Sequence, residues 1–189
     1  MIRLSPTIPI SQHSDVDAGR YVSGSRSGYV GTAAEAWPGA PEVSRACRQL
    51  DTEGESAENP LFPAEKWSGT ITSEWFSGNF AVVRHTNEKF SVSGEIHSLE
   101  VIAYDRTAKT YTWYGVDDHG GGGDLGKASI AGDVLTAVWE SQEKGKTYKF
   151  RGTLKGLGSD RLTFVMEYSE DGTTWKPFLH STDTRVKSK

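Results

Sequence analysis

The chain has 189 residues, a formal net charge of −4 and a single cysteine, Cys47. A chain of this size can bury one hydrophobic core, so we expect one domain with an appended segment. A single cysteine excludes an internal disulfide and a cysteine-rich zinc site. No lysine and arginine cluster interleaved with aromatic residues is present, so we expect no nucleic-acid partner.

The opening sequence, MIRLSPTIPISQHSD, contains prolines and polar residues where a secretory signal requires an unbroken apolar run. No later stretch approaches the length of a membrane span. We therefore expect a cytoplasmic protein with no membrane partner. The sequence leaves the oligomeric state open.

Composition divides the chain into three parts. Residues 1–49 are rich in Gly, Ser, Ala and Pro, and they predict a largely disordered arm because neither strand alternation nor a helical period is sustained. Residues 50–185 predict a folded domain, and residues 186–189 a short charged tail.

Within the folded part, short alternating segments and turns follow one another. The expected strands cover residues 67–76, 80–86, 96–103, 109–117, 127–131, 134–141, 147–154 and 162–168, with a last strand from Trp175. Residues 87–95 are expected to be a polar connection. Asp105 is expected to accept backbone N–H bonds in its turn rather than to act in catalysis.

Two hairpins have registers that can be predicted from their turns. Gly132-Asp133 suits a two-residue turn and places Ile130 opposite Leu135. In the last hairpin, Asp171-Gly172 at the centre places Tyr168 opposite Trp175.

About eight to nine consecutive strands with short connections pair most simply with their sequence neighbours. A meander of that length exposes two edges unless it closes, so we predict an all-β, antiparallel up-and-down barrel. A two-sheet sandwich is the alternative fold.

Three segments carry a family resemblance: WSGTITSEWFSGNFAVVRH, EVIAYDRTAKTYTWYGVDDHG and MEYSEDGTTWKPF. Over residues 50–185 the chain resembles a lipocalin-like bacterial family of uncharacterised proteins, known as a domain of unknown function. Ala103 stands where that family has a glycine, and its opening Gly-x-Trp strand is not recognisable before Glu53. The resemblance implies a calycin-type barrel and brings no catalytic residues or cofactor.

Bulky side chains at alternating positions form the candidate site. An eight-stranded barrel is just wide enough to hold one small ligand, so these residues either line a pocket or fill the interior. The candidate lining residues are Trp75, Tyr111, Trp113, Trp139, Phe150, Phe164, Met166, Tyr168 and Trp175.

The histidines form no close-spaced ligand pair, so we expect no metal site. The register of the last hairpin places His180 away from the interior unless a bulge at Pro177 reverses the alternation. We therefore expect a non-enzymatic protein that binds a small apolar or amphipathic molecule. The alternatives are an enzyme acting in the cavity and a haem-binding barrel resembling nitrobindin, with His180 as axial ligand.

Overall fold

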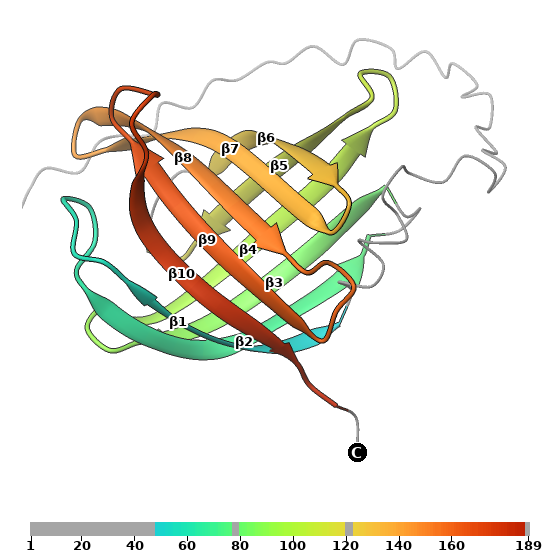
Figure 1. The fold of residues 1–189 in the computed structure, drawn as a ribbon, viewed down its shortest axis with the longest axis horizontal. Coiled ribbons are helices and arrows are strands. Elements are labelled where there is room, and N and C mark those ends of the chain that lie inside the picture. The colour runs from blue at the N-terminus through green and yellow to red at the C-terminus, as the bar shows by residue number, and fades with distance from the viewer. Residues whose placement is uncertain (1–47, 77–79, 120–122, 188–189) are drawn as a thin grey trace, which may run out of the picture. The chain divides into compact units, whose positions relative to one another are not determined.

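The computed structural model describes residues 48–76, 80–119 and 123–187. These residues form ten β-strands (Figure 1): β1 (Gln49–Ser56), β2 (Glu65–Trp75), β3 (Ala81–Phe90), β4 (Gly94–Asp105), β5 (Thr110–Asp117), β6 (Asp124–Ala131), β7 (Val134–Glu143), β8 (Lys146–Lys155), β9 (Arg161–Ser169) and β10 (Lys176–Arg185). Most of the predicted arm, the predicted turn at 77–79 and the middle of the glycine loop lie outside the described residues.

The ten strands form one closed antiparallel barrel. Each strand pairs with its sequence neighbour, and β1 pairs with β10 to close the ring (Figure 1). The predicted all-β, antiparallel up-and-down architecture is therefore confirmed. The predicted number of eight to nine strands is wrong, since the described chain has ten.

The strand that the sequence did not reveal is β1. Its inward-facing residues are Leu50, Thr52, Gly54 and Ser56, of which Leu50 alone is a large apolar side chain. Strand prediction relies on apolar alternation, so a segment with a small and polar inner face resembles a loop. For the same reason β3 extends to Phe90, into the predicted polar connection.

The two predicted hairpin registers have different outcomes. The Gly132-Asp133 turn is confirmed: Ile130 pairs with Leu135, and Gly132 has the positive φ of 61° that the first residue of such a turn requires. In the last hairpin Tyr168 pairs with Lys176 rather than Trp175, so the predicted register is wrong.

Within the last hairpin, the pairing of β10 with β9 shifts by one residue at a bulge between Pro177 and Leu179. Phe178 is the additional residue there, and it packs against the core. Beyond the bulge, Asp183 pairs with Leu162 and faces the interior.

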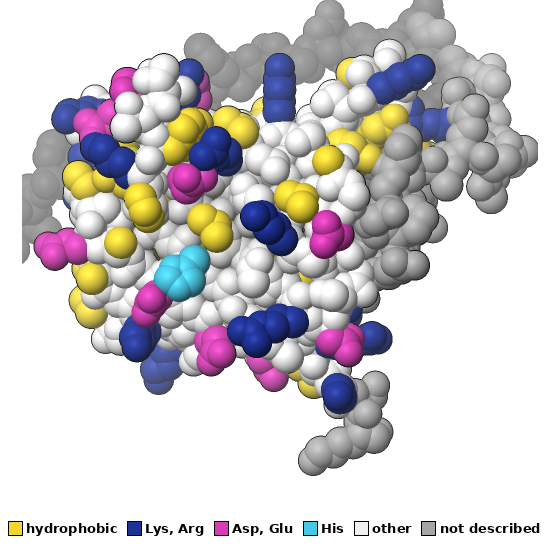
Figure 2. Space-filling model, viewed as in Figure 1, with side chains coloured by type: hydrophobic (Ala, Val, Ile, Leu, Met, Phe, Trp, Pro, Cys, Tyr) yellow, Lys and Arg dark blue, Asp and Glu magenta, His cyan; other side chains and the backbone are white. Residues whose placement is uncertain are grey.

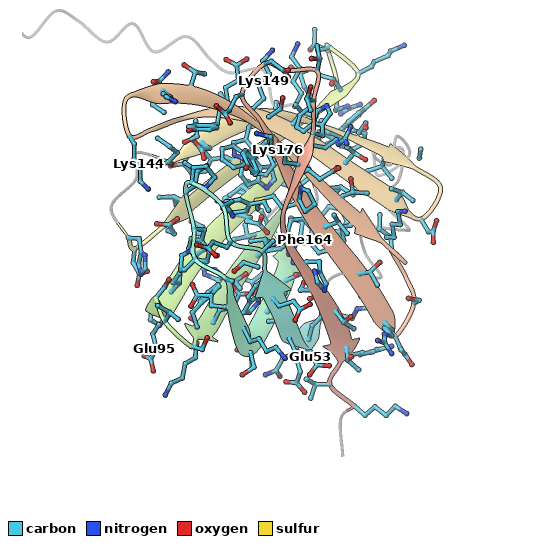
Figure 3. All side chains as sticks on the ribbon, turned by 60° about the vertical axis from the view of Figure 1, so that its left-hand side comes forward. Glu53, Glu95, Lys144, Lys149, Phe164 and Lys176 are labelled. Atoms are coloured by element: carbon cyan, nitrogen blue, oxygen red, sulfur yellow. The ribbon has the colours of Figure 1, made fainter. Side chains whose placement is uncertain are left out.

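Stacked aromatic rings occupy the centre of the core. The ring centroids of Trp113 and Trp139 lie 4.4 Å apart, and those of Trp139 and Phe150 lie 5.6 Å apart. Phe164 lies within the barrel in Figure 3, whereas Glu95 and Lys144 lie at its outside. Within residues 48–76, 80–119 and 123–187 there is no helix with the length and apolar character that a membrane span requires.

Leu162 and Thr163 are neighbours on β9, and they can test whether its side chains alternate between the core and solvent. Leu162 is 1% exposed in the core, and Thr163 faces solvent. We expect Leu162→Ala to lower the free energy of unfolding by about 2–5 kcal/mol, because it leaves a cavity in the core. Thr163→Ala should change it by about 0.5 kcal/mol or less. Urea unfolding of both variants is the measurement, and equal losses would contradict the assignment of faces.

Candidate functional site: the barrel interior

The aromatic wall of the interior lies on β5 to β9, and Trp75 of β2 also packs against the core. Of the candidate lining residues, the four buried in the core are Trp113, Trp139, Phe150 and Tyr168. Partly buried and packed against them are Trp75, Tyr111, Phe164 and Met166. The fold therefore brings eight of the nine candidate residues together inside the barrel.

Trp175 is the exception. It lies in the turn before β10, and the Arg151 guanidinium lies 4.4 Å from the centre of its ring. Arg151 also donates hydrogen bonds of 2.9 and 2.7 Å to Glu167 on the outer face of β9. Trp175 therefore packs outside the barrel, and the shifted register of the last hairpin explains why the sequence placed it inside.

A polar wall, which the sequence analysis did not predict, faces the aromatic one. Arg84 of β3 forms an ion pair of 3.1 Å with Glu100 of β4. The indole N–H of Trp113 donates a hydrogen bond of 3.2 Å to the same Glu100 carboxylate. Arg84 is two residues from buried Val82, and strand periodicity places both on the inner face. This alternation is the signal that could have identified the polar wall.

Asp183 of β10 belongs to the same wall and is 1% exposed. Its carboxylate accepts hydrogen bonds of 2.8 Å from the Thr52 hydroxyl and 3.0 Å from the Ser181 hydroxyl. A buried charge requires such partners, because desolvation is costly without them. Asp183 is therefore held by two hydroxyl groups and by no cation among the described residues.

Glu88 of β3 is the third carboxyl group of the polar wall. Burial, together with the charges of Asp183 and Glu100, raises its pKa to about 7, against the opposing effect of Arg84. The side chain of Trp67 also lowers this pKa, so the indole lies beside the carboxyl group. Trp67 is 6% exposed, yet its buried N–H has no acceptor in hydrogen-bonding geometry.

A cavity of about 20 Å³ lies between the polar wall and one end of the barrel. This volume accommodates about one water molecule. It is lined by Leu50, Ser73, Val82, Arg84, Ile102, Leu135, Leu154, Leu157 and Leu162. A larger guest in this region would require side chains to move.

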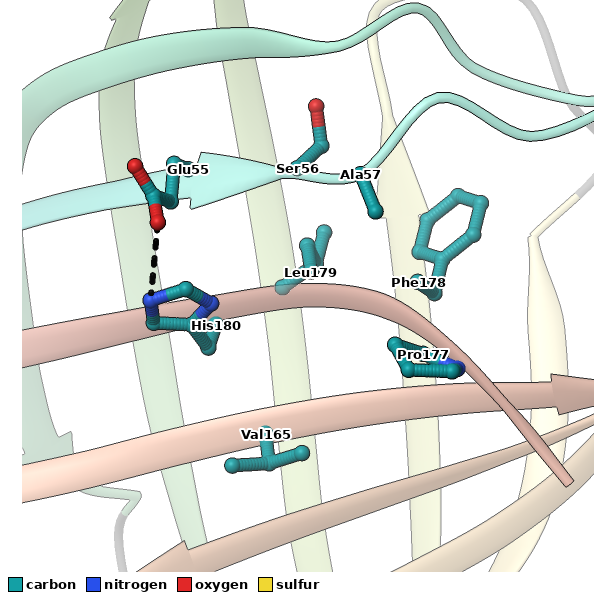
Figure 4. A pocket seen from close by; sticks show the side chains of 8 residues that line it. All are labelled: Glu55, Ser56, Ala57, Val165, Pro177, Phe178, Leu179 and His180. Atoms are coloured by element: carbon teal, nitrogen blue, oxygen red, sulfur yellow. Dashed lines mark ion pairs between the residues drawn. The ribbon is translucent and has the colours of Figure 1, made fainter.

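A second, more open space lies at the β10 bulge (Figure 4). This groove has a volume of about 400 Å³ and is lined by Glu55, Ser56, Ala57, Val165, Pro177, Phe178, Leu179 and His180. Phe178 also packs against the core, with its ring centroid 5.6 Å from that of Phe150. The side chain of Phe178 therefore contributes to both the groove and the interior.

His180 lies on the outer face, as the sequence predicted, even though a bulge is present. Its side chain is 61% exposed, and its Nε2 lies 3.5 Å from a carboxylate oxygen of Glu55 (Figure 4). The haem alternative requires this imidazole inside the barrel, so the geometry does not support it. In the described part of the chain, no group of three or more His, Cys, Asp or Glu side chains could hold a metal ion.

Residues that carry the family resemblance build turns. Asp105 accepts the backbone N–H groups of Thr107 and Ala108 at 2.8 and 3.0 Å, as predicted. Asp171 accepts those of Thr173 and Thr174, both at 2.7 Å, and these bonds hold its pKa below the ordinary value. Asp105 and Asp171 therefore position strands and lie outside the interior site.

Comparison with known proteins defines the fold and not the function. No family model matches the chain, and no curated protein matches it. Among solved structures, Rv2717c from M. tuberculosis is 11% identical with a TM-score of 0.57, covering 81% of this chain and 100% of that chain. The chain therefore shares a barrel fold with Rv2717c.

Two further structures have lower similarity. The S-type phycobiliprotein lyase CPES from Guillardia theta is 11% identical with a TM-score of 0.49, covering 77% of this chain and 91% of that one. A fluorescence-activating β-barrel designed de novo is 11% identical with a TM-score of 0.40, covering 74% of this chain and 92% of that one.

Glu88 should make stability depend on pH. Its pKa is raised from 4.5 to about 7 on folding, so the folded protein holds the proton more tightly than the unfolded chain does. Stability should therefore fall as pH rises from 4.5 to about 7, by about 3 kcal/mol at most. Glu88→Gln should remove this loss and be more stable than the wild type near pH 8. Urea unfolding across this range is the measurement.

The matched control is Glu95→Gln, which removes a carboxylate from the exposed outer face of β4. This variant should follow the wild-type pH profile. A Glu88→Gln profile parallel to that of the wild type would contradict the role assigned to Glu88.

Proposed function

We propose that the protein binds a small apolar or amphipathic molecule inside its barrel. The observation that carries the proposal is the division of the interior into an aromatic wall on β5 to β9 and a polar wall that contains Arg84, Glu88, Glu100 and Asp183. An amphipathic molecule has the same division between its tail and its headgroup.

The free energy that is lost when the ionisable groups of the polar wall are buried supports a binding role. Ionisable groups lose hydration when they are buried, and replacing a buried ion pair with packed apolar side chains is often neutral or stabilising. A barrel that served only as a scaffold would be at least as stable with leucines in place of Arg84 and Glu100. Their presence inside the barrel is therefore better explained by recognition of a polar group.

Access to the interior is proposed to occur at the β10 bulge. The groove there has about 400 Å³ of space, and Phe178 separates it from the core aromatic rings. A bulge disrupts the ladder locally, and it leaves Phe178 outside the regular pairing of β10 with β9. Rotation of Phe178 would connect the groove with the aromatic wall.

An enzyme acting in the cavity is the second candidate, and Glu88 is the observation that favours it. A carboxyl group with a pKa of about 7 can both donate and accept a proton at neutral pH, which is the requirement for general acid and base catalysis. Strongly shifted pKa values also occur in structural clusters, so binding remains the first proposal.

We further propose that the chain belongs to the lipocalin-like bacterial family that its motifs resemble and that it acts in the cytoplasm. The up-and-down barrel supports the family proposal, as do the turns built by Asp105 and Asp171. The cytoplasmic location rests on the sequence alone.

Interior binding can be tested with the neutral fluorescent probe N-phenyl-1-naphthylamine. Phe164→Ala would enlarge the interior next to the aromatic wall, so this variant should bind the probe about tenfold more tightly than the wild type. Thr163→Ala is the matched control, because Thr163 is the residue before Phe164 on β9, faces outward and lines neither the cavity nor the groove. The measurement is probe fluorescence titrated with protein.

Equal enhancement by the two variants would place the probe outside the barrel and contradict the proposal. Absence of probe binding by the wild type and by Phe164→Ala would also contradict it. Circular dichroism of both variants would confirm that each is folded.

A further inference from the structure

Arg48 has an unsatisfied pair of donors at the end of the barrel where β1 begins and β10 ends (Figure 1). Its Nε and Nη2 atoms are buried, and neither has a hydrogen-bond partner. The N–H groups of these two atoms lie side by side on one edge of the planar guanidinium group. A buried donor without a partner is destabilising, and more so when it is charged. The whole two-donor edge of this cation is therefore available to an acceptor.

Arg151 of β8 shows which group satisfies the same edge elsewhere in this chain. Its Nε and Nη2 donate hydrogen bonds of 2.9 and 2.7 Å to the carboxylate of Glu167. Hydrogen bonds between a guanidinium and a carboxylate are charge-assisted, and they are stronger than bonds between neutral groups. The corresponding edge of Arg48 is suited to the same type of acceptor.

The acidic side chains close to Arg48 have other partners. Asp160 forms an ion pair with Arg185, with 3.5 Å between the charged atoms, and Asp183 accepts hydrogen bonds from two hydroxyl groups. Burial, together with the positive charge of Arg185, lowers the pKa of Arg48, against the opposing effect of Asp160. Among the described residues, Arg48 therefore has a positive charge that no carboxylate contacts.

The backbone joins Arg48 to the inner wall of the barrel. Its carbonyl accepts a hydrogen bond of 3.0 Å from the N–H of Ser73, next to the pairing of Gln49 with Thr72. Strand alternation places Arg48 on the same face as Leu50, which is 2% exposed in the core.

The cavity of about 20 Å³ lies beside this position. Leu50 and Ser73 both line it, and so does Arg84, which pairs with Ser73 across β2 and β3. Ser73 is 5% exposed, so its hydroxyl is a buried polar group of the cavity wall. The remaining lining residues are apolar, among them Leu157. Arg48 therefore adjoins a small space that has a hydroxyl group, a guanidinium group and aliphatic side chains.

We propose that Arg48 binds the carboxylate of a small aliphatic acid at this end of the barrel, beside the Ser73 hydroxyl. A carboxylate is planar and singly charged, so it matches the two-donor edge and neutralises the unpaired charge. The aliphatic side chains of the cavity are suited to the alkyl part of the acid. The groove at the β10 bulge lies at the opposite end of β10, so this site is independent of the proposed function.

A phosphate group fits less well than a carboxylate. Arg84 is paired with Glu100 and Arg185 is paired with Asp160, so one guanidinium group remains for the ligand. One positive charge matches the single charge of a carboxylate, whereas a phosphate carries up to two negative charges at neutral pH.

The test titrates the wild type with butyrate at constant ionic strength and follows the Nε–H signal of Arg48 by ¹H–¹⁵N NMR. Constant ionic strength removes general charge screening as a cause of any change. We expect a saturable shift of this signal with butyrate and none with butanol, which has no charge. Phosphate should bind about tenfold more weakly than butyrate.

Two variants test the assignment through the signals of the ligand. Arg48→Gln should weaken butyrate binding about tenfold or more, because an amide cannot present the charged two-donor edge. Arg161→Gln is the matched control, since it removes one positive charge from an exposed position at the start of β9. Saturation-transfer NMR of butyrate gives both affinities, and circular dichroism reports whether each variant is folded.

The outcomes are decisive even if Arg48→Gln does not fold. A wild type whose Arg48 signal does not respond to butyrate, or that binds butanol as well as butyrate, would overturn the proposal. Tighter binding of phosphate would overturn the ligand class. An unchanged butyrate affinity in a folded Arg48→Gln variant would overturn the role of Arg48. Interior binding, measured with N-phenyl-1-naphthylamine, is unaffected by any of these results.

Discussion

The backbone ladder between β1 and β10 is the interaction on which the rest of the structure depends. It runs from the pairing of Leu50 with Arg185 to that of Ser56 with Leu179. Without it, a ten-stranded meander would have two unpaired edges, and the residues that now face each other across the interior would lie on one open sheet. β1 has few apolar side chains, so backbone hydrogen bonding makes a large contribution to closure. The hydrogen bond from Thr52 to Asp183 crosses the same seam and links closure to the polar wall.

The small inward-facing side chains of β1 also determine where the side chains of the polar wall lie. A Cβ atom at Gly54 would clash with the indole of Trp67, so glycine at this position allows the ring to lie flat against β1. In that position Trp67 stacks on Phe90 and directs its N–H toward Glu88. The same feature that hides β1 in the sequence, the near absence of large inner side chains, therefore provides the room in which Glu88 and Trp67 meet. Outside the barrel, charges of both signs are interspersed on the face shown in Figure 2.

Much of the architecture could be predicted from the sequence, because most strands obey a simple alternation. Leu162 to Tyr168 alternate inward and outward as expected, and the Gly132-Asp133 turn fixes the register of its hairpin. The polar wall could not be found in the same way, because polar side chains on a strand are ordinarily taken to face water. Glu88 lay within a predicted connection for that reason. Its environment depends on Glu100 of the neighbouring strand and on Asp183, which is distant in sequence and approaches Glu88 only when the barrel closes.

The bulge in β10 decides which ionisable group faces the interior. If the pairing of Tyr168 with Lys176 continued without an additional residue, Phe164 would pair with His180, and that imidazole would point inward. Insertion of Phe178 shifts the pairing, so that Phe164 meets Ser181 and Leu162 meets Asp183. One inserted residue thus replaces a potential metal ligand in the interior with a carboxylate and a hydroxyl. It also places Phe178 at the boundary between the outer groove and the core. The acidic character of the interior and its proposed route of access therefore have a common structural origin.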